Sequence, residues 1–138
     1  MTLCAKEFRG HVEYVVSKFS APHNLVNFDT LCVLWEPAIA SGAGKAYANP
    51  NGFLLAWFIT DPISGERTAA QQFWMQAPGH RNFHAALNLF FEFEADAKAW
   101  GAQRILSGCV VISDIPKMRR LYKKLGYHSF SETFCKVL

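Results

Sequence analysis

The segment at residues 76–87, QAPGHRNFHAAL, decides the fold of this chain because a strand ends there and an amphipathic helix begins. Pro78-Gly79 ends the strand, and the pattern predicts the longest helix of the chain over residues 81–100. A wide apolar stripe on this helix, fit to lie on a sheet, comprises Phe83, Ala86, Leu87, Phe90, Phe93, Ala97 and Trp100. A buried strand is expected next, at residues 104–111. A strand, a helix and a strand in this order predict a crossover connection and a parallel strand pair.

The residues upstream of this junction predict an antiparallel meander. Apolar runs typical of strands are separated by two segments with strong turn chemistry, Asn49–Gly52 and Asp61–Gly65. The three predicted strands lie at residues 45–48, 53–60 and 67–76.

Two helices are predicted before the meander, from apolar residues that recur at helical spacing over residues 3–19 and 28–36. Candidate N-caps are Thr2 for the first helix and Asn27 or Asp29 for the second. Pro37 is expected to break or kink the second helix.

The residues downstream complete an α+β fold. Ser113 or Asp114 is expected to cap a last helix, which Gly126 ends, and residues 127–138 are predicted to form a closing strand. The predicted fold is therefore a mixed, mostly antiparallel sheet with helices on both faces. The 138 residues are expected to form a single domain over residues 1–138.

Composition excludes several classes of protein. With 51% hydrophobic and 18% charged residues the chain is not disordered. Its longest apolar run falls far short of the ~20 residues that span a bilayer, and charges interrupt its N-terminus where a signal peptide is apolar. A cytoplasmic protein without a membrane partner is expected. The net charge of +3 is too small to imply a nucleic-acid partner.

Metal binding is not expected. The four cysteines lie far apart, with no CxxC pair. His80 and His84 are an i,i+4 pair, but the segment HRNFH lacks the glutamate of a zinc-binding HExxH helix.

Two segments contain groups that could bind a ligand or take part in catalysis. The helix start within residues 76–87 has free N–H groups that attract phosphate, although most strand-to-helix junctions look equally permissive. Tyr122, in the segment LYKKLGY at residues 121–127, has a phenol that can exchange a proton, or it simply packs at the edge of its helix. The basic face of that helix is a solvated face or meets a phosphate-rich ligand or nucleic acid; it comprises Arg119, Arg120, Lys123 and Lys124.

Taken together, the two segments make residues 45–138 resemble the GNAT superfamily of acyl-CoA N-acyltransferases. In that family a meander leads into a phosphate loop of pattern P-x-x-[RQ]-x-x-G-x-[GA], which corresponds here to Pro78, Arg81, His84 and Ala86. A later helix ends in a motif like L-Y-e-k-L-G-[FY], which matches residues 121–127.

The resemblance implies a site for acetyl-CoA and transfer of its acetyl group to an amine, in a small molecule or a protein. A V-shaped gap between the central parallel strands would hold the pantetheine arm, beside Met75, Gln76 and Ala77. The pyrophosphate would lie on residues of the loop and helix start, namely Arg81, Asn82, Phe83, His84, Ala85 and Ala86. Tyr122 would protonate the departing thiolate. Residues 1–44 would shape the acceptor side, and residues 45–138 would form the cofactor-binding core.

The sequence departs from the family at two places. His84 stands where the pattern has glycine, so its imidazole either crowds the pyrophosphate or hydrogen-bonds it. The chain also begins with a predicted helix, so the family's first strand is missing or very short. The residues identify no general base; Glu94 is a candidate because it falls within the apolar stripe. The alternative function is a catalytically inactive binding or structural protein with this fold. A homodimer, paired through strands at the C-terminus, is a further possibility.

Overall fold

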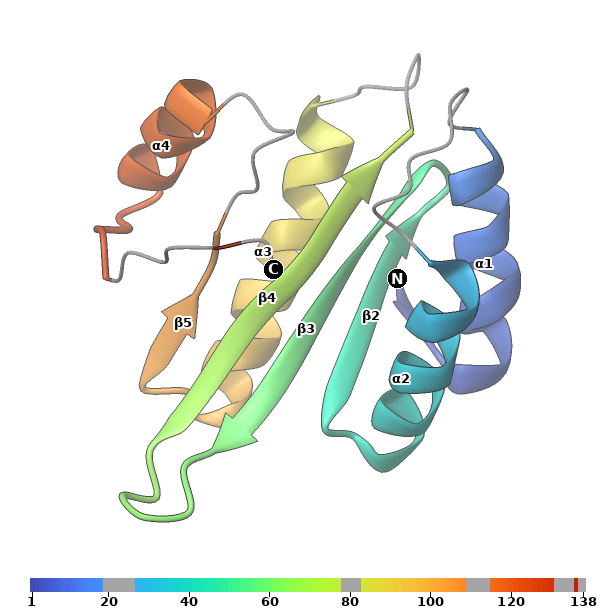
Figure 1. The fold of residues 1–138 in the computed structure, drawn as a ribbon. Coiled ribbons are helices and arrows are strands. Elements are labelled where there is room, and N and C mark those ends of the chain that lie inside the picture. Colours follow the sequence, from blue (N-terminus) through green and yellow to red (C-terminus); the bar gives the residue numbers. More distant parts are fainter. Residues whose placement is uncertain (19–26, 78–82, 109–114, 131–135, 137–138) are drawn as a thin grey trace. The chain divides into compact units, whose positions relative to one another are not determined.

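A five-stranded mixed sheet forms the centre of the larger of two compact units, Met1–Ser107; the smaller unit is Gly108–Leu138. In this computed structural model the described residues are 1–18, 27–77, 83–108, 115–130 and 136. The strand order is β1-β2-β3-β4-β5 (Figure 1). The strands are β1 (Thr2–Leu3), β2 (Gly44–Asn49), β3 (Gly52–Thr60), β4 (Arg67–Gln76) and β5 (Arg104–Leu106). The first four pair antiparallel, and β4 and β5 pair in parallel, which confirms the predicted α+β fold.

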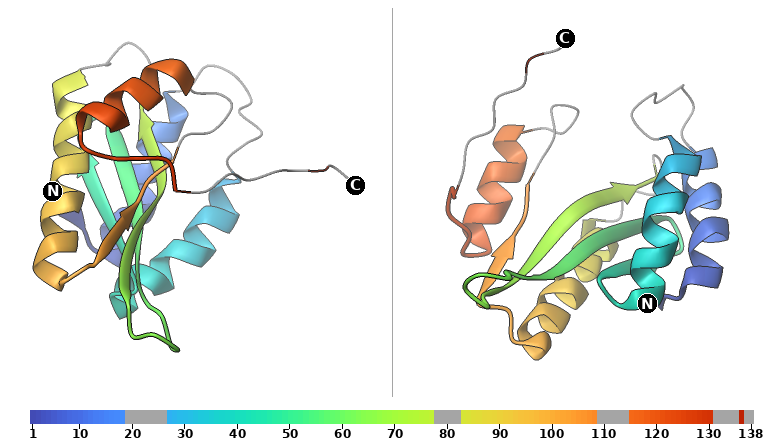
Figure 2. Two further views of the ribbon diagram at one scale, coloured as in Figure 1. Left: turned by 90° about the vertical axis from the view of Figure 1, so that its left-hand side faces the viewer. Right: turned by 60° about the horizontal axis from the view of Figure 1, so that its bottom comes forward.

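Helices cover both faces of this sheet (Figures 1 and 2). On one face α1 (Ala5–Ser17) and α2 (Phe28–Ser41) pack on side chains such as Phe53 and Leu55. On the other face α3 (Phe83–Trp100) buries Leu89, Phe90, Phe93 and Ala97. Successive strand residues point to opposite faces, which explains why the near-continuous apolar run of β3 is buried on both sides.

The N-terminal segment differs from its prediction. Thr2 does not cap a helix, because Thr2 and Leu3 pair with Tyr47 and Ala46 of β2 and form a very short first strand. Helix α1 begins after Cys4, whose N–H donates to Oε2 of Glu7 at 3.1 Å. The burial of Leu3, which is 3% exposed, favours strand pairing over one more helical turn.

Helix α2 is longer than predicted. Asn27 caps it as expected, since its Oδ1 accepts a hydrogen bond from the Thr30 N–H. Pro37 does not break the helix, which continues to Ser41 and ends at Gly42 with a φ of 80°. Pro37 is exposed, so water can satisfy the backbone carbonyl that loses its helical partner.

The last predicted strand is wrong over residues 127–130, which are not in a strand. Helix α4 spans Ile115–Lys124. Gly126, two residues after it, has a φ of 88°, and the Tyr127 N–H donates to the Tyr122 carbonyl at 2.9 Å. That bond closes the helix C-terminus and occupies an N–H that a sheet would need. The rest of the predicted strand, except Lys136, lies outside the described residues, so the homodimer through this segment stays a prediction. The predicted strand at 104–111 is strand only at Arg104–Leu106; Ser107 and Gly108 are not, and 109–111 lie outside the described residues.

Among the described helices, none combines the length and apolar character that crossing a lipid bilayer requires.

Candidate functional site

Strand β4 has a bulge in its middle. Leu55 of β3 lies opposite Phe73, and Ala56 lies opposite Gln71, so Gln72 is an extra residue. A bulge bends its strand and changes the direction of nearby side chains, and bulges are frequent beside active sites. Sequence reasoning missed this feature, although two adjacent glutamines, Gln71 and Gln72, interrupt the alternation of the strand.

The parallel pairing of β4 with β5 ends just before this bulge. The paired residues of β4 are Thr68, Ala69 and Ala70, opposite Arg104–Leu106, whereas β4 itself continues to Gln76 (Figure 1). The two parallel strands therefore share only the first part of β4 within the described ladder. The second part of β4 is where the sequence predicts the cofactor residues Met75 and Gln76.

The predicted residues at the end of β4 are attached to the β2–β3 hairpin. Met75 is half-buried and packs against the core on the α1–α2 face. Gln76 accepts a hydrogen bond at its Oε1 from the side-chain amide of Asn49, at 3.1 Å. Ala77 is fully buried, and its N–H donates to the Asn51 carbonyl at 2.8 Å.

The first turn of α3 contains the other described members of the predicted site. Phe83 and His84 are exposed, and their rings lie 6.1 Å apart between centroids. Ala85 and Ala86 are half-buried. The first turn contains no acidic residue, so no carboxylate there opposes an anion at this helix N-terminus. The predicted residues Arg81 and Asn82 lie outside the described residues.

Asn49 brings the two described parts of this site together. Its Nδ2 donates to Gln76 Oε1 and also to the backbone carbonyl of Ala85, at 3.2 Å. The sequence analysis assigned Asn49 only to a turn. No local signal identifies its partners, which lie 27 and 36 residues further along the chain.

Tyr122 belongs to the smaller unit and is half-buried. Its hydroxyl donates to the Gly108 carbonyl at 2.9 Å, and its ring lies 5.6 Å from that of Tyr127. The predicted basic face of α4 is exposed at Arg119, Arg120, Lys123 and Lys124. The structure therefore gives the Tyr122 hydroxyl a partner within its own unit.

Of the tryptophans in the larger unit, Trp35 is buried in the core and the others are half-buried. Trp35 is 1% exposed and lies 4.3 Å from Trp57 between ring centroids. Trp74 stacks on Phe90 of α3 at 5.5 Å. Glu94 is half-buried on α3. The described residues contain no group of three His, Cys, Asp or Glu side chains arranged to hold a metal ion.

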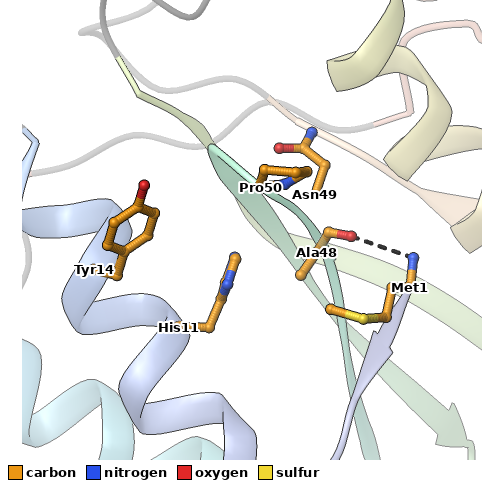
Figure 3. A pocket seen from close by; sticks show the side chains of 6 residues that line it. All are labelled: Met1, His11, Tyr14, Ala48, Asn49 and Pro50. Carbon is orange, nitrogen blue, oxygen red and sulfur yellow. Dashed lines mark hydrogen bonds between the residues drawn. The ribbon is translucent and has the colours of Figure 1, made fainter.

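A pocket of about 440 Å³ lies between α1 and the β2–β3 turn (Figure 3). The described residues of the predicted cofactor site do not line it, but Asn49, which bonds to two of them, does. The residues that line it are Met1, His11, Tyr14, Ala48, Asn49 and Pro50. The Met1 ammonium donates to the Ala48 carbonyl at 3.2 Å, and His11 Nε2 lies 3.0 Å from the Gly52 carbonyl oxygen. These contacts fix α1 and the N-terminus to the hairpin.

Known proteins resemble this chain in structure only. No family model matches the sequence, and no curated protein matches it. An aminoglycoside acetyltransferase from an uncultured soil metagenomic sample has 17% identity, with 100% of this chain and 96% of that chain covered, at a TM-score of 0.72. A GCN5-related N-acetyltransferase from Ralstonia eutropha JMP134 has 14% identity, with 99% and 96% covered, at a TM-score of 0.69. A predicted acetyltransferase with acetyl-CoA from Clostridium acetobutylicum has 14% identity, with 99% and 94% covered, at a TM-score of 0.67. At such identities the likeness is one of fold.

Proposed function

The chain has the GNAT fold, and from this premise we propose that it is an N-acetyltransferase that uses acetyl-CoA. The arrangement of β4 and the helix that follows it carries the proposal. Strand β4 bulges at Gln72, its parallel pairing with β5 stops at Ala70, and the next helix has no acidic residue in its first turn. Among the described residues the second part of β4 has no parallel partner, and such a strand end beside a helix N-terminus offers N–H donors both to an extended chain and to a phosphate.

Acetyl-CoA would supply an acetyl group that is activated as a thioester. The backbone around Met75–Ala77 would pair with the pantetheine arm, and one N–H there would bind the carbonyl oxygen as negative charge develops on it. The first turn of α3, with Ala85 and Ala86, and the preceding Arg81 and Asn82 would bind the pyrophosphate. The small side chains of the two alanines leave the backbone N–H groups accessible.

Tyr122 is the proposed general acid. An amine would attack the thioester carbonyl, the carbon–sulfur bond would break, and the Tyr122 hydroxyl would donate its proton to the departing sulfur. In the structure this hydroxyl donates to the Gly108 carbonyl, so the O–H would have to turn away from that partner. The amine would release its own proton to a water molecule or to a base in the acceptor site.

The acceptor is an amine in a small molecule or a protein. Both free cysteines among the described residues, Cys4 and Cys32, fit a reducing compartment, and we propose that the protein acts in the cytoplasm.

Calorimetry with acetyl-CoA tests the first half of the proposal. The expected result is saturable binding at sub-millimolar cofactor, and no binding at millimolar cofactor would refute it. Transfer is then followed by release of the free thiol with a panel of primary amines. We expect Tyr122→Phe to bind acetyl-CoA as the natural protein does and to transfer about 100-fold more slowly or worse, the usual scale for loss of a general acid. An unchanged rate would exclude this role.

A second candidate function is a GNAT-fold protein without catalytic activity. The observation that favours it is His84, an imidazole in the first turn of α3 where the family pattern has glycine. His84→Gly distinguishes the two functions. If coenzyme A binds only to this variant, the natural protein is not an acetyl-CoA enzyme; if the natural protein binds it as well as the variant does, His84 is no obstacle.

A further inference from the structure

Strand β2 presents a row of polar side chains to α3. Lys45, Tyr47 and Asn49 alternate along the strand, so they share one face of the sheet. Lys45 Nζ and the Tyr47 hydroxyl both donate to Oδ2 of Asp96, at 2.9 and 3.0 Å. Asn49 donates instead to the carbonyl of Ala85, about three helical turns nearer the N-terminus of α3. Hydrogen bonds from β2 thus attach α3 at two positions along the helix axis.

The Asn49 side chain has a defined orientation. Its Nδ2 donates to Gln76 Oε1 at 3.1 Å and to the Ala85 carbonyl at 3.2 Å, while its Oδ1 accepts from the Asn51 N–H at 2.9 Å. A carboxamide has two donor hydrogens and one acceptor oxygen, so all of its functional atoms are used. Exchanging the nitrogen and the oxygen would point an acceptor at the Ala85 carbonyl and a donor at the Asn51 N–H, two backbone groups that cannot change roles.

The neighbouring glycine makes room for this arrangement. Gly52 lies opposite both Asn49 and Gln76 in the sheet register. A Cβ at Gly52 would overlap Gln76 Oε1 and would lie 2.6 Å from the Met75 carbonyl oxygen. The Gln76 amide therefore lies directly on the hairpin backbone, within reach of Asn49, because residue 52 has no side chain.

We propose that Asn49 is a positioning residue for the coenzyme A phosphates, an inference that rests on the proposed function. Asn49 links the end of β4, at Gln76, to the first turn of α3, at Ala85. These are the two described ends of the proposed cofactor site. Backbone N–H groups bind a phosphate only when they point at it within hydrogen-bond distance, so the link between the two ends sets how well they act together. Asn49 does this without touching the ligand.

The test compares substitutions on the same strand and the same face. Asn49→Asp keeps the size of the side chain but replaces its donors with acceptors and adds a negative charge near the proposed phosphate site. The Gln76 amide can turn and donate to the new carboxylate, whereas the Ala85 carbonyl cannot, so the bond to the helix is lost selectively. Asn49→Leu removes the same donors without that charge, so equal weakening of coenzyme A binding in the two variants assigns the effect to the lost bond, whereas natural affinity in Asn49→Leu assigns it to charge and overturns the proposal. The matched control is Lys45→Met, which removes a bond from the same strand to the far end of the same helix; there Tyr47 still donates to Asp96.

Calorimetry then gives the dissociation constant of coenzyme A for each variant, alongside its midpoint of thermal unfolding. We expect Asn49→Asp to weaken coenzyme A binding about 5- to 30-fold, the range for losing a hydrogen bond and setting a carboxylate oxygen against the Ala85 carbonyl oxygen in its place. The dissociation constant of Lys45→Met for coenzyme A should stay within about twofold of that of the natural protein, because the lost bond is remote from the site. Its midpoint of thermal unfolding should fall about as far as that of Asn49→Asp. A twofold effect or less from Asn49→Asp, or an equal effect from Lys45→Met, would overturn the proposal.

Amide hydrogen exchange separates failure of this inference from failure of the proposed function. The N–H groups of Leu87, Asn88 and Leu89 donate to carbonyls of the first turn of α3, so their exchange reports on that turn. Faster exchange at these amides in Asn49→Asp but not in Lys45→Met is the expected result. If the natural protein binds no coenzyme A, the proposed function fails. If these amides exchange equally fast in the two variants, Asn49 does not position the first turn of α3, whether or not coenzyme A binds.

Discussion

The two ends of helix α3 are held in different ways. At the C-terminal end Asp96 accepts bonds from Lys45 and Tyr47, and Arg67 donates to the Trp100 carbonyl at 2.7 Å while its guanidinium lies over the Trp100 ring. At the N-terminal end Phe83 and His84 are exposed, and Asn49 is the side chain seen to bond the backbone there. The helix is therefore firmly attached at the end remote from the proposed ligand.

This difference agrees with the proposed function. A helix N-terminus can bind a phosphate only if its first N–H groups are left without intrahelical partners and open to solvent. Packing that buried Phe83 and His84 would stabilise the fold and close the site. Segments that bind ligands are generally drawn from the less stable parts of a protein for this reason. The C-terminal end of α3 provides the stability that the N-terminal end cannot.

The largest effect should come from the part of α3 that is buried. Phe93 is fully buried, and its ring lies 6.2 Å from that of Tyr47 and 6.4 Å from that of Phe58 between centroids. Phe93→Ala should lower the free energy of unfolding by about 3–5 kcal/mol, the usual cost of removing a buried phenyl ring. Urea denaturation measures this difference.

Phe91→Ala is the matched control on the same helix, because Phe91 is 44% exposed. Its effect should stay within about 0.5 kcal/mol. Equal losses from the two substitutions would mean that burial against the sheet does not anchor this helix.

A smaller effect, dependent on pH, should come from the Tyr47–Asp96 bond. Burial and the Asp96 carboxylate raise the pKa of the Tyr47 phenol above its ordinary value of 10.0. Because the folded pKa is the higher one, the stabilisation is complete below pH 10 and is lost as pH rises above that value, by up to about 1.4 kcal/mol per pH unit. At neutral pH, Tyr47→Phe should lower the free energy of unfolding by about 1–2 kcal/mol.

The difference between the natural protein and Tyr47→Phe should therefore shrink above pH 10. Tyr14→Phe is the control for loss of a phenol hydroxyl, since Tyr14 is 52% exposed and its replacement should change the free energy of unfolding at neutral pH by less than about 0.5 kcal/mol. A constant difference between the natural protein and Tyr47→Phe up to pH 11 would show that Tyr47 does not anchor α3 in the way the structure implies.

The sequence predicts structure well where local contacts determine it, and poorly where contacts between distant parts of the chain do. Strand β4 was predicted with its observed bounds, Arg67–Gln76, because turn residues mark both of its ends. The end of α3 at Trp100 was predicted as well, because a glycine, Gly101, follows it. In the structure Gly101 has a φ of 83°, which favours glycine. The predicted closing strand is wrong over residues 127–130, because Tyr127 has strand-like neighbours but gives its N–H to the helix.

The candidate site was less predictable than the fold. A motif pattern assigned Met75, Gln76, Ala85 and Ala86 to one site, and the Asn49 bonds do bring Gln76 and Ala85 together. Asn49 itself was assigned only to a turn, because its role depends on partners that fold next to it from distant parts of the chain. The role of Tyr122 stays a prediction, since a sequence motif carries it and its observed bond is to Gly108.

The smallest effect is expected at the N-terminal end of α3, where Phe83 is 51% exposed. Phe83→Ala should change the free energy of unfolding by less than about 0.5 kcal/mol in the urea experiment used for Phe93→Ala. Coenzyme A binding should also stay within about twofold, because the proposed contact is to backbone N–H groups that alanine retains. If Phe83→Ala instead destabilised the protein as much as Phe93→Ala does, the two ends of α3 would be equally anchored. A first turn packed that firmly would have no need of Asn49 to position it.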